Sequence, residues 1–174
     1  MWDSAASGSE RHIRSASVEP NVTEPPKREQ GEVRVAKMSV VELRKFLRDE
    51  FPQAFASDDI TIESADGETC IVRQRYSDRM LRPGGTISGP TLMGLADFAI
   101  YVVLLSAIGP VGLAVTSDLN IHFLRKGAPS HDIVAAARLL KVDRRLAVGE
   151  VDLFSKGLVD PIARVSATYS IPVA

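Results

Sequence analysis

The fold is decided by the run from Thr91 to Val115, TLMGLADFAIYVVLLSAIGPVGLAV. Asp97 is its only charged residue, and Gly109-Pro110 divides it. Pro90, just ahead of the run, suits the first turn of a helix, and a Gly-Pro pair ends one. The sequence therefore predicts a helix from Pro90 to about Ile108 that is apolar on all sides, so nearly every side must be enclosed.

A membrane span is the first alternative for so apolar a run, because about 20 apolar residues cross a bilayer. Three arginines precede it, as positive flanking would require: Arg75, Arg79 and Arg82. Against a span stand the break at Gly109-Pro110 and Asp97, whose carboxylate would cost roughly 2.5 kcal/mol or more inside the apolar slab. We therefore predict the core helix of a globular domain, with no membrane partner.

Strand patterns lie on both sides of this helix. Upstream, two short strands, Ile60–Glu63 and Thr69–Tyr76, flank the turn residues Ala65-Asp66-Gly67 and predict a hairpin. A glycine- and proline-rich loop, Ser77–Pro90, joins that hairpin to the helix. Downstream, four strands are predicted: Val115–Phe123, Ile133–Lys141, Leu146–Ser155 and Ile162–Ile171. Alternation along the first of these puts Thr116 on a polar face with Asp118, opposite an apolar face with Leu119.

This order predicts an α+β architecture in which a curved antiparallel sheet of five to six strands wraps around the long central helix. Short links between the last four strands predict a largely local strand order. An extra N-terminal helix is predicted after Met38, because Ser39 and Glu42 have capping-box spacing. Phe51-Pro52 ends that helix.

The chain is predicted to hold one domain, residues 37–174, after a disordered tail, residues 1–36. The formal net charge of −1 gives no global basic field, so no nucleic-acid partner is predicted. Cys70 is the single cysteine, and the three histidines have no metal-site spacing, so no disulfide and no metal site are expected. No secretory signal is recognisable, and we expect a cytoplasmic protein.

Asp97 is the candidate catalytic group, because an ionised carboxylate in such a helix must be hydrogen-bonded, paired or next to water. As a structural residue it would cap a neighbouring element or pair with an arginine. As a functional residue it would be a general base or nucleophile on a rigid helix beside a pocket. The sequence pattern alone leaves both open.

The glycine-containing loop ends at the predicted helix start, where free N–H groups and the helix dipole suit a carbonyl oxygen or an oxyanion. Gly89 precedes Asp97 by eight residues, about 12 Å along a helix axis. That distance is too long for both residues of one chain to act on one carbonyl. A two-fold dimer would solve this if Asp97 of one subunit faced the loop of the other.

The run from Arg82 to Ala99, RPGGTISGPTLMGLADFA, resembles the glycine-loop-to-helix segment of hot-dog acyl-CoA thioesterases of the phenylacetate-degradation type. Val115–Arg125, Asp132–Arg138 and Arg144–Val148 resemble the next three strand segments of that family. The resemblance covers roughly Ile60 to Ile171. It implies a hot-dog fold and hydrolysis of an acyl-CoA thioester to a free acid and coenzyme A, without a cofactor.

The resemblance also implies roles for residues. Asp97 attacks the thioester carbonyl or activates water, the partner subunit's Gly89 N–H polarises that carbonyl, and Thr116, acting across the subunit interface, helps to position the water. Two departures concern the helpers of Asp97. Ser88 stands where many members have histidine, and Arg82 stands where many have asparagine. Ser88 can replace the hydrogen bond of that histidine but not its ring.

Cations are expected to bind the phosphates of coenzyme A. The candidates are two pairs of adjacent residues, Arg144-Arg145 and Arg125-Lys126, together with Arg82 in the loop. The resemblance implies a homodimer and a homotetramer built as a dimer of dimers. Two other functions stay open: a non-catalytic protein that binds acyl-CoA or an aromatic ligand, and a dehydratase, which normally needs a catalytic histidine absent from this loop.

Overall fold

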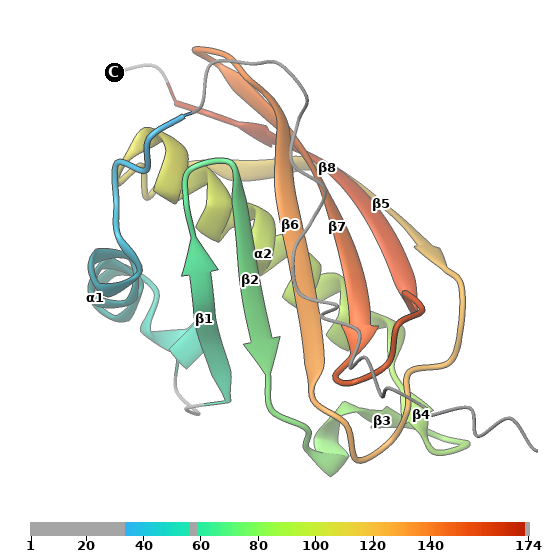
Figure 1. Cartoon of the computed structure of the whole chain (residues 1–174). Coiled ribbons are helices and arrows are strands. Elements are labelled where there is room, and N and C mark those ends of the chain that lie inside the picture. Colours follow the sequence, from blue (N-terminus) through green and yellow to red (C-terminus); the bar gives the residue numbers. More distant parts are fainter. Residues whose placement is uncertain (1–33, 56–58, 173–174) are drawn as a thin grey trace, which may run out of the picture.

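A six-stranded antiparallel sheet wraps around one long helix (Figure 1). The computed structural model describes residues 34–55 and 59–172, so most of the predicted tail lies outside the described residues. The helices are α1 (Val40–Glu50), the 3₁₀ turns η1 (Pro52–Phe55) and η2 (Asp78–Met80), and α2 (Gly89–Ile108). The sheet strands are β1 (Ile60–Ala65), β2 (Thr69–Gln74), β5 (Val115–Phe123), β6 (Ile133–Val142), β7 (Leu146–Ser155) and β8 (Ala163–Ser170). The predicted α+β class and the hot-dog arrangement are confirmed.

The strand order is β1-β2-β6-β7-β8-β5, which departs from the local order predicted for the last four strands. The hairpins β6–β7 and β7–β8 are local, as expected. However, β5 pairs with β8 across the whole segment between them, and β2 occupies the place beside β6. This exchange puts β5 at an edge of the sheet, and almost all of its side chains are exposed.

The central helix α2 begins at Gly89, with Ser88 as its N-cap, and Gly109 ends it at a φ of 97°. By length and hydropathy this helix would pass as a membrane span. Here it is the core helix. Its buried residues pack on the inner face of the sheet: Leu92, Leu95, Ala96, Phe98, Ala99, Ile100, Val102, Val103, Leu104, Leu105, Ser106 and Ala107.

The N-terminal helix α1 covers the flank of α2 beside β1 (Figure 1). The predicted capping box is present: Ser39 N–H donates to the Glu42 carboxylate at 2.8 Å, and Ser39 Oγ accepts from Glu42 N. Leu43 and Leu47 are fully buried on the same face of α1. Helix α1 thereby extends the cover that the sheet provides for α2.

The segment predicted only as a loop, Ser77–Pro90, holds local structure. After η2 it forms a small hairpin of β3 (Leu81–Arg82) and β4 (Thr86–Ile87). Gly84 and Gly85 make its turn with φ of 95° and 70°, a region that favours glycine. The chain therefore reaches the start of α2 through a folded turn.

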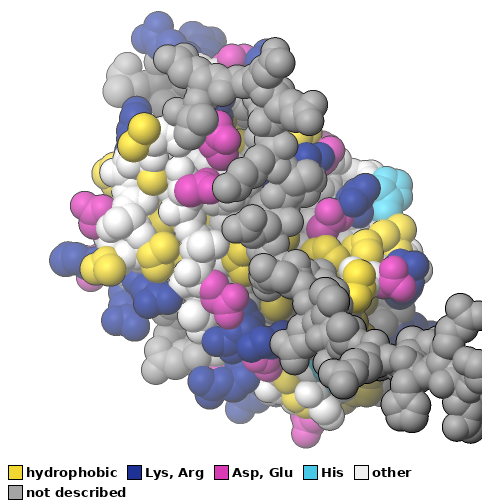
Figure 2. All heavy atoms as spheres, viewed as in Figure 1, with side chains coloured by type: hydrophobic (Ala, Val, Ile, Leu, Met, Phe, Trp, Pro, Cys, Tyr) yellow, Lys and Arg dark blue, Asp and Glu magenta, His cyan; other side chains and the backbone are white. Residues whose placement is uncertain are grey.

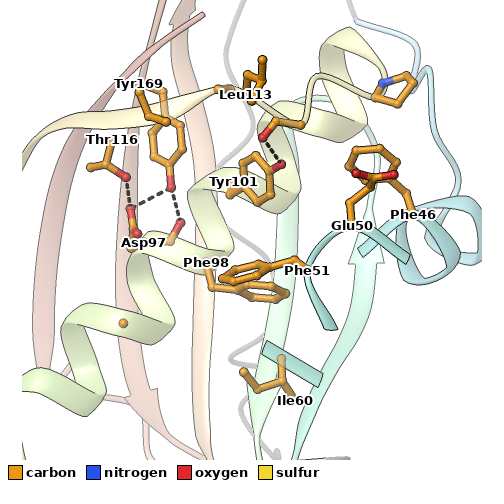
Figure 3. A pocket seen from close by; sticks show the side chains of 15 residues that line it. Phe46, Glu50, Phe51, Ile60, Asp97, Phe98, Tyr101, Leu113, Thr116 and Tyr169 are labelled. Carbon is orange, nitrogen blue, oxygen red and sulfur yellow. Dashed lines mark hydrogen bonds between the residues drawn. The ribbon is translucent and has the colours of Figure 1, made fainter. Parts of the chain in front are cut away.

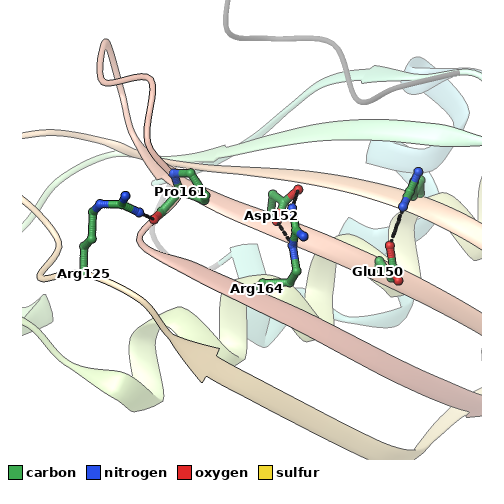
Figure 4. A network of polar contacts seen from close by, with 6 residues as sticks. Arg125, Glu150, Asp152, Pro161 and Arg164 are labelled. Atoms are coloured by element: carbon green, nitrogen blue, oxygen red, sulfur yellow. Dashed lines mark hydrogen bonds and ion pairs between the residues drawn. The ribbon is translucent and has the colours of Figure 1, made fainter.

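The outer face of the sheet carries paired charges. Arg138 on β6 binds Glu150 on β7 at 2.6 Å, and Arg164 on β8 binds Asp152 at 2.7 Å (Figure 4). Each pair joins residues that are directly opposite in the strand register. On the face viewed in Figure 2, basic and acidic side chains are interspersed. The apolar helix and the pocket described below lie on the other side of the sheet.

Helix α2 packs closely against the sheet at Gly149 on β7. A Cβ at this position would lie 2.6 Å from Ile100 Cδ1 on α2 and 3.0 Å from the Arg138 carbonyl oxygen. Glycine therefore sets the depth at which the helix is seated.

We expect Gly149→Ala to lower the free energy of unfolding by about 1–3 kcal/mol, because the added methyl overpacks the contact between helix and sheet. Denaturant unfolding measures this. The matched control is Gly94→Ala on α2, where nothing lies within 4 Å of an added Cβ and alanine favours helix. An unchanged stability in Gly149→Ala would contradict the close contact.

Candidate active site

Asp97 lies on the face of α2 that turns away from the centre of the sheet, and its side chain is partly buried. Gly94, Phe98 and Tyr101 share this face, because residues three and four apart are neighbours on a helix. All four residues line one pocket. The only charged residue of α2 therefore faces a cavity, as the functional interpretation of Asp97 requires.

Two hydroxyl groups hold one oxygen of the Asp97 carboxylate (Figure 3). Thr116 Oγ1 donates to Oδ1 at 2.5 Å, and the Tyr169 hydroxyl donates to the same atom at 2.7 Å. The Tyr169 hydroxyl also lies 2.9 Å from the Asp97 carbonyl oxygen. No described residue donates a hydrogen bond to Oδ2. One carboxylate oxygen is thus fixed by two donors, and the other has no donor among the described residues.

Tyr169 is buried, with 3% of its surface exposed, and its ring stacks on Tyr101 with centroids 6.1 Å apart. Burial raises the pKa of the Tyr169 phenol above its ordinary value, and the neighbouring Asp97 carboxylate raises it further. The phenol therefore stays protonated and acts as a donor to Asp97 at neutral pH.

Thr116 was expected to act across the subunit interface, but in the structure its hydroxyl bonds Asp97 of the same chain. The alternation along the strand put Thr116 on a polar face with Asp118, away from Leu119. In the structure a β-bulge at Ser117 shifts the register between Thr116 and Asp118. The extra residue turns Thr116 to the inner face that Leu119 shares, so the predicted face was wrong. The Ser117 hydroxyl donates to the Thr168 carbonyl at 3.1 Å and braces the bulge.

Tyr169 was not among the candidate residues. It lies on β8 directly opposite Thr116 on β5, so the two hydroxyls come from one cross-strand pair. The sequence holds a signal for it, because Tyr169 is the only tyrosine in the last predicted strand. However, its partner follows only from the pairing of β5 with β8, which short-range patterns do not give.

The pocket beside Asp97 has a volume of about 950 Å³. Asp97, Thr116 and Tyr169 lie together at one side of it, and Phe46 and Glu50 of α1 lie at the other (Figure 3). Its remaining lining residues come from the end of α1, the start of β1, α2, and the link from α2 into β5: Phe51, Ile60, Gly94, Phe98, Tyr101, Pro110, Gly112, Leu113, Ala114 and Val115.

The predicted oxyanion residues, Gly89 and Ser88, are not among the residues that line this pocket. They lie at the start of α2, about 12 Å along the axis from Asp97 by helical rise. Ser88 Oγ bonds the Thr91 hydroxyl at 2.8 Å and caps the helix. A Cβ on Gly89 would lie 3.1 Å from Phe123 Cζ, so the last residue of β5 packs against the start of α2.

The predicted cations are all exposed, and they are spread over the molecule. Arg82 lies on β3, Arg144-Arg145 form the turn between β6 and β7, and Arg125-Lys126 follow β5. Arg125 lies 3.5 Å from Asp160 and donates to the Pro161 carbonyl. None of these cations lines the Asp97 pocket. Within the described ranges, no cluster of three or more His, Cys, Asp or Glu side chains is placed to hold a metal ion.

Comparison with known proteins agrees with this fold. The sequence profile of the Thioesterase superfamily matches residues 84–162. A candidate thioesterase from Silicibacter sp. TM1040 is 38% identical, with a TM-score of 0.74, and the match covers 81% of this chain and 96% of that one. No protein of curated function matches the chain significantly.

Two more distant structures show the same fold. The PaaI protein of the E. coli phenylacetic acid degradation operon is 22% identical, with a TM-score of 0.63, over 75% of this chain and 95% of that one. A hypothetical thioesterase from Streptococcus pneumoniae TIGR4, solved with coenzyme A, is 20% identical, with a TM-score of 0.63, over 75% and 97%.

Proposed function

Because this chain belongs to the thioesterase superfamily, we propose that it is an acyl-CoA thioesterase that uses Asp97 to hydrolyse the thioester to a free acid and coenzyme A. The observation that carries the proposal is the Asp97 carboxylate. Oδ1 is held by Thr116 and Tyr169, and Oδ2 is free of described donors beside a pocket of about 950 Å³. A carboxylate with one oxygen fixed is oriented before the substrate arrives.

Two routes fit this arrangement. As a general base, Oδ2 takes a proton from water while the water oxygen bonds to the thioester carbon. The tetrahedral intermediate then collapses, the carbon–sulfur bond breaks, and the proton leaves with the thiolate as coenzyme A. As a nucleophile, Oδ2 attacks the carbon itself, the carbon–sulfur bond breaks, and coenzyme A leaves as the thiolate. Water then hydrolyses the resulting anhydride, which releases the acid and restores the Asp97 carboxylate, and a proton from that water goes to the thiolate. In both routes the hydroxyls of Thr116 and Tyr169 position the carboxylate.

Either route needs a donor for the developing oxyanion, and Gly89 of the same chain is too far along the helix. The edge strand β5 supports a donor from a partner subunit. Along β5, Thr116 at one end bonds Asp97, and Phe123 at the other packs on Gly89. Antiparallel pairing of two β5 edges about a two-fold axis sets the start of one against the end of the other. The partner's Gly89 N–H then approaches Asp97.

The β5 edge has the exposed apolar side chains that such an interface would bury. Val115 and Phe123 within the strand are 59% and 53% exposed. Leu113 and Leu124 flank it with 78% and 49% exposed. A long edge strand with unpaired backbone groups and exposed apolar residues is a template for pairing with another strand.

Coenzyme A would extend from this interface to exposed cations. The streptococcal structure with coenzyme A supports a ligand of this type for the fold. Arg144-Arg145 lie near the start of β5, because Leu146 and Val115 both pair with Ser170. Arg125-Lys126 lie at the opposite end of β5. A dimer about the β5 edges brings cations from both ends toward one site.

A non-catalytic binding protein is the second candidate function. It is favoured by Ser88, whose hydroxyl caps α2 and bonds Thr91 where many relatives have a histidine. Such a protein would bind acyl-CoA and release no thiol.

We expect Asp97→Asn to lower kcat for acyl-CoA hydrolysis by roughly 10³-fold, the scale of a lost general base. The amide keeps the shape and still accepts hydrogen bonds from Thr116 and Tyr169, so binding and folding should persist. Release of coenzyme A, measured with a thiol reagent over short, medium, long and aromatic acyl groups, tests this. Binding of all these thioesters by the wild type with no thiol release would favour the second candidate.

We expect Tyr169→Phe to lower kcat by roughly 10- to 100-fold with little change in KM, because one donor to the carboxylate is lost. The matched control is Tyr101→Phe. Tyr101 stacks on Tyr169 and lines the same pocket, but its hydroxyl lies 3.3 Å from the Gly112 carbonyl and bonds no atom of Asp97. Equal losses of kcat in the two variants would contradict a role through Asp97.

A site that needs two subunits also makes activity depend on protein concentration. We expect the protein to sediment as a dimer or a dimer of dimers, and its specific activity to fall on dilution below the dissociation constant. Full activity in a species shown to be monomeric would contradict the contribution of the partner's Gly89.

A further inference from the structure

We propose that the pocket beside Asp97 takes the acyl group and that Glu50, on the α1 side of the pocket, restricts it to acyl groups without a distal negative charge. This inference rests on the proposed thioesterase function and names its substrate class. It concerns a wall built by α1, which lies outside residues 84–162 that match the superfamily profile.

The pocket is continuous with the reacting carboxylate. Tyr101 follows Asp97 by one helical turn, about 6 Å along the axis. The face of α2 that carries Asp97 therefore also forms the floor of the pocket toward α1. In Figure 3 the Tyr101 ring lies between the Asp97 side and the side formed by Phe46 and Glu50. An acyl chain whose carbonyl is at Asp97 would extend along this face.

Aromatic side chains form the walls that an acyl chain would meet. Phe46 on α1 closes against the backbone of Gly112, where an added Cβ would lie 3.6 Å from Phe46 Cζ. Phe51, which follows α1, and Phe98 on α2 form a second aromatic group in the pocket (Figure 3). These surfaces offer no compensation for the hydration that a charged group would lose.

The charges of the lining residues are all negative. Asp97 and Glu50 are the two carboxylates, and no Lys, Arg or His is among the lining residues. Glu50 forms no ion pair with another described residue, so its charge is not neutralised locally. The pKa of the Tyr101 phenol is raised, first by burial and then by the Glu50 charge, as expected when both side chains line one pocket.

A matched pair of substrates isolates this charge. Hexanoyl-CoA and adipoyl-CoA have acyl chains of equal carbon number, ending in a methyl group and a carboxylate. We expect the wild type to favour hexanoyl-CoA by roughly 100-fold or more in kcat/KM, because a distal carboxylate is both desolvated and repelled. Equal use of the two substrates, or a preference for adipoyl-CoA, would overturn the proposal.

Variants at position 50 assign the effect to Glu50. We expect Glu50→Gln to reduce this preference roughly three- to fivefold, the scale of a solvent-exposed charge pair, and Glu50→Lys to reduce it further. High salt should shrink both effects by screening. The matched control is Asp49→Asn, because Asp49 is the preceding residue of α1, is exposed and lines no part of the pocket. An unchanged preference in Glu50→Lys, or an equal change in Asp49→Asn, would overturn the role of Glu50.

The same comparison can be made without turnover. S-hexyl-CoA and S-(ω-carboxypentyl)-CoA are thioethers that cannot be hydrolysed, and calorimetry gives their dissociation constants with the wild type and the position 50 variants. We expect tighter binding of the hexyl analogue and a gap that narrows in Glu50→Lys. If no thioester is hydrolysed but this pattern holds, the proposed function fails and the pocket assignment stands. Equal affinity for both analogues would refute the pocket assignment by itself.

Discussion

The structure depends on one constraint: a carboxylate within an apolar helix needs partners, and those partners come from two strands that are distant in sequence. Thr116 and Tyr169 supply two hydroxyls to a single oxygen of Asp97. Burying the carboxylate without them would cost several kcal/mol. The pairing of β5 with β8 therefore has a chemical consequence, because it brings both donors to the same turn of α2.

The same pairing underlies the proposed contribution of a partner subunit to the site. By pairing with β8 instead of β6, β5 becomes the edge of the sheet. Its two ends then contact two points of α2 for which we propose a function, Thr116 at Asp97 and Phe123 at Gly89. These points are eight residues apart on a rigid helix and cannot converge within one subunit. The proposed partner contribution thus follows from the strand order together with the length of α2.

Much of the fold could be predicted from local patterns. The apolar run gave α2 to within a residue at its start, Ser39 and Glu42 gave the capping box of α1, and alternation gave the six sheet strands. The position of β5 could not be predicted, because a short link suggests a hairpin but does not force one. The hairpin of β3 and β4 was missed, because each strand has only two residues and offers no period to detect.

The candidate site could likewise be predicted only in part. Asp97 could be identified from one sequence, because a lone charge in an apolar helix needs an explanation. Tyr169 could not, because its partner depends on the register between two distant strands.

Thr116 was chosen by resemblance and predicted on the wrong face of its strand. The prediction assumed strict alternation, which does not allow for one extra residue in the strand. The bulge at Ser117 supplies that residue, and the Ser117 hydroxyl bonds the Thr168 carbonyl next to Tyr169. A bulge is a small departure from a regular strand, yet here it decides which hydroxyl faces the helix. A regular β5 would turn the Thr116 side chain away from α2 and leave Tyr169 as the only hydroxyl donor to the Asp97 side chain. The irregularity is therefore part of the site.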